Sequence, residues 1–166
     1  MIDDTLLPFS PPSVQRKKVT AAFDGGRISS DGGVMLLALA ERRLGIADRL
    51  AWEISDRRDP SRVVHALSDI LRARILAIAR GYEDADDLDH LRGDPALKLA
   101  CGHLPDSGRD LCSQPTVSRC ENAPGLREVI RLMRAMMAQY CASYDTPPAS
   151  VTLDIDDTLD VVHGHQ

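Results

Sequence analysis

Aromatic side chains and long apolar runs are scarce in this sequence. Only 4% of the 166 residues are Phe, Trp or Tyr, so the core has to be built from Leu, Ile, Val, Ala and Met. No apolar run approaches the roughly 20 residues that a membrane-spanning helix needs. The first residues, MIDDTLLPFSPP, carry acids where a secretory signal peptide needs Lys or Arg. We therefore expect a cytoplasmic protein without a membrane span.

Cysteines are also few. The chain has four, at positions 101, 112, 120 and 141, and none forms the close C-x(2–4)-C pairs that are typical of structural zinc sites. A reducing compartment disfavours disulfides. A zinc site from Cys101, His103, Cys112 and Cys120 is conceivable, but the spacing favours isolated buried thiols.

The sequence lacks the basic excess of a dedicated DNA-binding domain. Its net charge is −5, whereas such domains are usually basic, so composition alone does not indicate nucleic acid. The charge is unevenly distributed, because residues 145–166 carry five acids and no Lys or Arg. The glycines of DGGRISSDGG (24–33) lack the Lys-Ser/Thr of a phosphate-binding P-loop. They favour turns and a small β-hairpin over residues 17–29.

Apolar residues at steps of three and four predict a mainly helical region. We expect helices over 33–44, 46–54 and 61–80, short helices over 96–101 and 113–119, and a long helix from Leu126 to Tyr140. The acidic stretch 82–93 lacks the calcium-loop pattern of an EF-hand and favours the start of a short helix. Prolines near the N-terminus indicate an irregular arm over 1–16. The expected organisation is thus this arm, a mostly helical region over 17–144, and a separate segment over 149–166.

The helix expected near residue 113 has the composition of a DNA-recognition helix. Its residues QPTVSR place short polar side chains and an arginine near the helix start. The candidate DNA contacts here are Gln114, Thr116, Ser118 and Arg119. Arg72 and Arg74 lie off the apolar stripe of their own helix, so they belong either to a solvated face or to contacts with the DNA backbone.

The closing segment is predicted to be a strand with one acidic face. Val151, Leu153 and Ile155 alternate with Thr152, Asp154 and Asp156. An exposed acidic edge strand is one interpretation. The other is a metal site, because two aligned carboxylates suit Mg²⁺, which prefers oxygen ligands. Asp156 and Asp154 are therefore candidate metal-binding residues.

Two known families have a strand of this kind. The string DIDDT (154–158) resembles the D-x-D-x-T motif of haloacid-dehalogenase-type phosphatases, in which the first Asp is the nucleophile. In that family the motif usually lies near the start of the catalytic domain, whereas here only eight residues follow Thr158. A phosphatase also gives the preceding helical region no role.

A second resemblance extends over residues 17–166. LDIDDTLDVVHGHQ resembles the first catalytic segment of DDE transposases of bacterial insertion sequences, in the group numbered thirteen-eighty. One residue more than in the commonest form separates Thr158 from Asp160. The upstream motifs that agree are FDGGRISSDGG (23–33), ARGYEDADD (79–87), LRGDPALKL (91–99) and SQPTVSRCEN (113–122).

This resemblance implies a ribonuclease-H-like α/β core whose first strand lies within 149–166. Asp156 would be the first Asp of the Asp-Asp-Glu triad, with Asp154 as the alternative, and the full-length enzyme would use Mg²⁺. The helical region would bind the terminal inverted repeats of the transposon and help a homodimer to form, associated with the nucleoid when on DNA. No second Asp and Glu stand in a convincing strand, so we expect this chain alone to be inactive. A non-catalytic helical DNA-binding module is the remaining alternative.

Overall fold

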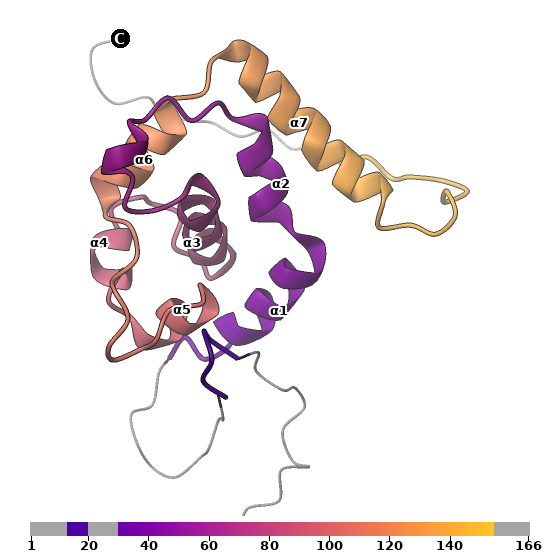
Figure 1. The fold of residues 1–166 in the computed structure, drawn as a ribbon. Coiled ribbons are helices and arrows are strands. Elements are labelled where there is room, and N and C mark those ends of the chain that lie inside the picture. Colours follow the sequence, from indigo (N-terminus) through magenta and orange to yellow (C-terminus); the bar gives the residue numbers. More distant parts are fainter. Residues whose placement is uncertain (1–12, 20–29, 155–166) are drawn as a thin grey trace, which may run out of the picture.

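The computed structural model describes residues 13–19 and 30–154 of the chain. The described part is helical (Figure 1). Its elements are α1 (Val34–Leu44), α2 (Ile46–Glu53), the 3₁₀ helix η2 (Pro60–Arg62), α3 (Leu67–Ala79), α4 (Leu88–Leu91), α5 (Pro95–Ala100), α6 (Gln114–Asn122) and α7 (Leu126–Cys141). In Figure 1, α3 lies in the middle of the body and the other helices surround it, apart from α7, which projects outward.

Small and aliphatic side chains allow α3 to take this central position. Its buried residues, Ile70, Ala73, Leu76 and Ala77, recur at steps of three and four, so they form one apolar stripe. The side chains that join this stripe in the core include Val34 of α1, Leu88 and Leu91 of α4, Leu97 of α5 and Val117 of α6. The core is aliphatic, as the low aromatic content predicts.

The first two helices agree with the sequence-based prediction, and one residue separates them. Gly45 adopts φ 63°, ψ 34°, a left-handed conformation that favours glycine. The carboxylate of Glu41 then accepts the backbone N–H groups of Ile46 at 2.9 Å and Ala47 at 3.2 Å. One side chain of α1 thus satisfies two of the free donors at the start of α2.

The helix predicted over 61–80 is wrong in its first six residues. The carboxylate of Asp59 accepts the N–H of Ser61 at 3.0 Å, which caps the short η2 turn. Val63 and Ala66 have extended backbones, and the adjacent β-branched Val63 and Val64 favour that conformation. Arg58 also donates to the carbonyl of His65 at 3.0 Å. The continuous helix therefore begins only at Leu67.

Helix α7 packs against α2 and leaves much of its apolar side uncovered. The apolar stripe predicted for this helix is present, yet Leu126, Met133 and Met137 are each more than 60% exposed. The buried residues of α7 are Ala135 and the charged Glu128. Burial of an apolar stripe therefore does not account for the docking of α7, and Glu128 becomes important for it.

The β-structure predicted from the sequence is not seen in the described residues. Within residues 13–19 and 30–154 the structure contains no strand, only an isolated antiparallel bridge between Val14 and Lys17. Most of the predicted hairpin falls on residues 20–29, outside the described part. The predicted acidic strand is described only as far as Asp154, where the chain is exposed and unpaired with any strand. None of the described helices is long and apolar enough to span a membrane.

Candidate nucleic-acid interface

Helix α6 is fixed by its buried side, which determines what its other side presents. Val117 is fully buried among the core residues. At the helix start, the carboxylate of Asp89 on α4 accepts the backbone N–H of Gln114 at 3.1 Å, as an N-cap residue would. These two anchors leave Arg119 on the exposed surface.

The four residues of α6 that were predicted to contact DNA have different surroundings. Gln114 donates to the hydroxyl of Ser118 at 3.1 Å, and the hydroxyl of Thr116 lies 3.2 Å from that of Ser113. All three are half-buried. Arg119 differs, because its guanidinium makes no hydrogen bond or ion pair with any described residue. It is the member of this set that can bind an anion without first breaking an internal contact.

Arg72 and Arg74 are held in contacts within the protein. Arg72 lies 3.1 Å from Asp48, 3.3 Å from Asp69 and 3.6 Å from Glu41. Arg74 lies 2.6 Å from the carboxylate of Glu121 and donates to the carbonyls of residues 82 and 83. Their side chains are 20% and 14% exposed. Both arginines join α3 to its neighbours, and the DNA contacts predicted for them remain predictions.

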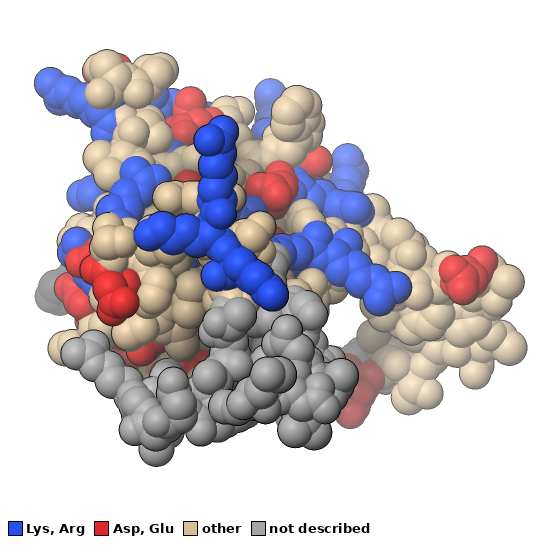
Figure 2. All heavy atoms as spheres, turned by 60° about the horizontal axis from the view of Figure 1, so that its bottom comes forward, with Lys and Arg blue, Asp and Glu red and all other residues tan. Residues whose placement is uncertain are grey.

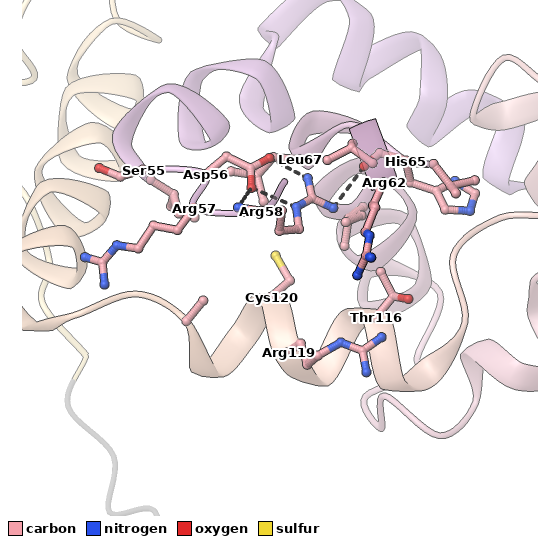
Figure 3. Close-up of a pocket in the computed structure, with 15 residues that line it drawn as sticks. Ser55, Asp56, Arg57, Arg58, Arg62, His65, Leu67, Thr116, Arg119 and Cys120 are labelled. Carbon is pink, nitrogen blue, oxygen red and sulfur yellow. Dashed lines mark hydrogen bonds and ion pairs between the residues drawn. The ribbon is translucent and has the colours of Figure 1, made fainter. Parts of the chain in front are cut away.

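A cavity of about 510 Å³ lies between α6 and the segment 54–67 (Figure 3). Its apolar lining comes from both walls and includes Ile54, Val63, Leu67, Ile70, Cys120 and Ala123. Four arginines also line it, namely Arg57, Arg58, Arg62 and Arg119. The cavity therefore combines an apolar interior with a cationic border.

Arg58 is a structural member of this group. Its guanidinium donates to both carboxylate oxygens of Asp56, at 2.8 and 2.6 Å, and to the carbonyl of His65 at 3.0 Å. These donated hydrogen bonds lower the pKa of Asp56, so the carboxylate stays charged and the pair stays closed. Arg58 thereby fixes the wall of the cavity and has little capacity left for a ligand.

The other border arginines are more open. Arg62 is 87% exposed and lies 3.8 Å from Asp59, and Arg57 is 78% exposed and lies 3.8 Å from Glu128. Such exposed pairs are weak. In Figure 3, Arg62 and Arg119 extend from opposite walls toward the same side of the cavity, while Arg57 extends away from them. Arg57 and Arg62 were not predicted from the sequence. The string DRRDPSR (56–62) holds three arginines, but its two acids offset most of their charge.

The remaining polar groups in the lining carry little charge near neutral pH. Burial lowers the pKa of His65, and the nearby Arg109 and His103 lower it further. Burial likewise raises the pKa of the Cys120 thiol. His65 is therefore expected to be a neutral imidazole and Cys120 a neutral thiol in the interior.

Basic side chains also gather on a second surface. Figure 2 turns the bottom of Figure 1 forward, and Lys and Arg side chains cover the middle of the face that appears. The segment 13–19 lies at this end of the molecule (Figure 1). This segment carries three exposed basic residues, Arg16, Lys17 and Lys18. A chain with an overall negative charge thus has local basic surfaces.

The candidate catalytic carboxylates are only partly described. Asp154 is exposed at the end of residues 151–154, which have no regular secondary structure, and Asp156 lies outside the described part. Carboxylate oxygens are suitable ligands for Mg²⁺. However, the described residues contain no group of three His, Cys, Asp or Glu side chains that could hold a metal ion. The described residues therefore do not form a complete metal site, and their geometry does not define a reaction step.

Comparison with known proteins identifies the family. A sequence model of the family described as "Transposase DDE domain group 1" matches residues 11–166. No curated protein and no solved structure gave a significant match. The match favours the transposase resemblance over the phosphatase one. Because it extends over nearly the whole 166-residue sequence, the chain belongs to this family of DDE-domain transposases.

Proposed function

We propose that this chain belongs to an insertion-sequence transposase of the group numbered thirteen-eighty, and that its helical region binds the terminal inverted repeats of the element. In this proposal the enzyme is a homodimer that works on DNA at the nucleoid. Its Mg²⁺-dependent cleavage and strand transfer use Asp156, with Asp154 as the alternative triad member. The family match supports the general activity, and the described helices support the DNA-binding part.

The observation that carries the proposal is the position of Arg119 beside the cavity, opposite Arg62. Arg119 has no partner among the described residues, and Arg62 has only a distant one, Asp59 at 3.8 Å. A phosphate can therefore replace water at both guanidinium groups without breaking a strong internal ion pair. Arginines 57, 62 and 119 border one cavity, so they present positive charge locally although the whole chain carries −5.

The proposal is tested by measuring the binding of the 166-residue chain to duplex DNA. The specific duplex carries the inverted repeat that flanks the gene, and a scrambled duplex of equal length measures non-specific binding. We expect Arg119→Ala to weaken specific binding by at least about fivefold. Because one phosphate contact is lost, the slope of log affinity against log salt concentration should fall in magnitude by about 1. Fluorescence anisotropy at several salt concentrations gives both quantities.

Arg134→Ala is the matched control, because Arg134 is an exposed residue of α7 and does not line the cavity. It removes the same charge at a distance from the proposed contact. Equal affinities for the Arg119 and Arg134 variants would contradict the assignment of this surface. Equal affinities of the unmodified chain for the two duplexes would contradict the recognition of inverted repeats.

A further inference from the structure

We propose that the cavity between α6 and the segment 54–67 accepts one unstacked DNA base, while Arg62 and Arg119 hold the phosphates on either side of it. This inference rests on the proposed DNA-binding function and adds to it a specific site and the chemical class of its ligand. Most DNA-binding surfaces read stacked base pairs from a groove, so the cavity would be a separate mode of contact.

The size of the cavity suits such a ligand. Its volume is about 510 Å³, within the range of about 300–1,000 Å³ that is typical of pockets for small molecules. Its two walls are helix α6 and the segment that includes η2. A volume of this size can hold a single base, whereas an intact duplex is too large for it.

The interior favours a base over a phosphate. Ile54, Leu67 and Ile70 contribute apolar side chains to it, and the donors of Arg58 are used by Asp56 and by the carbonyl of His65. A phosphate placed inside would lose its water without gaining a free cation. A base is flat and largely apolar on its faces, so it loses much less.

The border supplies what the phosphates on both sides of that base require. Arg62 is 87% exposed and Arg119 has no partner among the described residues, and they extend toward the same side of the cavity (Figure 3). An uncharged apolar ligand would gain nothing from them. An apolar interior beside two open arginines therefore matches a base that is attached to a phosphate backbone.

His65 provides a surface for the base itself. It lines the cavity, and its lowered pKa keeps the imidazole neutral near pH 7. A neutral imidazole can stack on a base or exchange a hydrogen bond with it, and histidine is among the side chains on which unstacked bases are bound.

The test compares two single strands that carry equal numbers of phosphates. One is a hexathymidylate, and the other is a six-residue abasic strand with a tetrahydrofuran at each sugar position. Single strands are used because no base pair has to be opened first. We expect the 166-residue chain to bind hexathymidylate about tenfold more tightly, since stacking of one base contributes on this scale. Anisotropy of strands with a fluorophore at one end gives both affinities.

Two variants that fill the cavity separate the base from the backbone. Ala123→Leu and Cys120→Leu add aliphatic volume to its lining and should reduce the preference for hexathymidylate to about twofold or less, without changing the affinity for the abasic strand. Because Ala123 is exposed, its replacement is the less disruptive of the two. Ala142→Leu, at the exposed end of α7, is the matched control. Thermal melting verifies that each variant is folded.

The outcomes distinguish this inference from the function on which it rests. Arg119→Ala should lower the affinity of the chain for both single strands by the same factor. If the two strands bind equally and the filling variants change nothing, the base site is refuted, while a lower affinity of Arg119→Ala for duplex DNA would still support DNA binding. If neither the duplex nor any single strand binds, the proposed function fails, and the base site fails with it.

Discussion

The carboxylate of Glu128 accepts the backbone N–H of Ser55 at 2.9 Å, across 73 residues of sequence. The same carboxylate accepts the N–H of Gly125 at 2.8 Å, so it caps its own helix α7 as well. Arg57 and Arg131 approach it at 3.8 and 3.7 Å. The backbone hydrogen bonds that Glu128 accepts lower its pKa to about 2, and the one from Gly125 contributes more than the one from Ser55.

This relationship predicts an acid-sensitive attachment of α7. The pKa of Glu128 is about 2 in the folded chain, against about 4.3 for an unperturbed Glu. Its stabilising contribution is therefore complete above the unfolded value and is lost as the pH falls through the folded value. We expect Glu128→Gln to lower the melting temperature at pH 7, and this difference to shrink steadily between pH 4.5 and pH 2.

Circular dichroism melts over that range measure the effect. Glu83→Gln is the control, because Glu83 is exposed and no side-chain contact of its carboxylate is found in the described structure. A melting difference for Glu128→Gln that stays the same from pH 7 to pH 2 would contradict the assignment.

A second prediction concerns the ion pair that holds the start of α1 against the end of α3. Asp31 is 8% exposed and is paired with Arg80, which also donates to the carbonyl of Ser30 at 3.2 Å. Arg80→Met removes the guanidinium that pairs with this buried carboxylate. Because Arg80 itself is 27% exposed, we expect a loss of about 1–3 kcal/mol in the free energy of unfolding.

Urea unfolding of this variant is compared with that of Arg43→Met. Arg43 is an exposed residue in the last turn of α1, where loss of the charge removes only a weak helix-dipole contribution. Similar midpoints for the two variants would show that the pair with Asp31 contributes no more than a surface charge.

A third prediction separates the cysteines by reactivity. Cys141 is exposed, which corrects the expectation that all four thiols are buried. Burial raises the pKa of Cys101 to about 12 and that of Cys112 to about 11, and it raises that of Cys120 as well. Since the thiolate is the reactive form, Cys141 should react first with a disulfide reagent at pH 8. Cys101 and Cys112 should react at full rate only in denaturant.

The reaction is followed by the absorbance of the released thiolate. Cys141→Ser should remove the fast phase and leave the slow ones unchanged. A fast phase that persists in this variant would place a reactive thiol elsewhere in the chain.

A fourth prediction addresses the catalytic carboxylates of the proposed function. Asp156→Asn should abolish excision of the element from a donor plasmid in cells, because an amide cannot replace a charged metal ligand. Asp145→Asn, in the segment after α7, is the control with the same chemical change. If Asp154→Asn abolishes excision and Asp156→Asn does not, Asp154 is the triad member and Asp156 is not. Normal excision by both variants would exclude these two carboxylates from the catalytic centre.

Local signals in the sequence were sufficient for some helices. The bounds of α1 and α2 follow from their periodic apolar residues and from Gly45, whose left-handed conformation separates them. The predicted start of α3 was wrong because a hydrogen bond from a side chain to a backbone carbonyl seven residues away helps to keep residues 63–66 out of the helix. Arg58 binds the carbonyl of His65, and apolar spacing contains no information about such a tie.

In the candidate site, too, the features that depend on local sequence could be predicted and those that depend on long-range contacts could not. Arg119 was predicted as a candidate DNA contact from the local string QPTVSR, and this prediction depends only on a short helix. The partners of Arg72 and Arg74 lie 24 and 47 residues away, at Asp48 and Glu121, so periodicity could place these arginines off the apolar stripe but could not reveal their ion pairs. The cavity was not predicted because its two walls come from separate parts of the chain.

The segment 54–58 has contacts on two sides that connect the cavity to α7. Ile54, Asp56 and Arg58 line the cavity, while the N–H of Ser55 is bonded to Glu128 near the base of α7. The same short segment is therefore a wall of the cavity and also an anchor of α7. We expect a substitution that shifts its backbone to disturb both the cavity and the hydrogen bond that holds the first turn of α7.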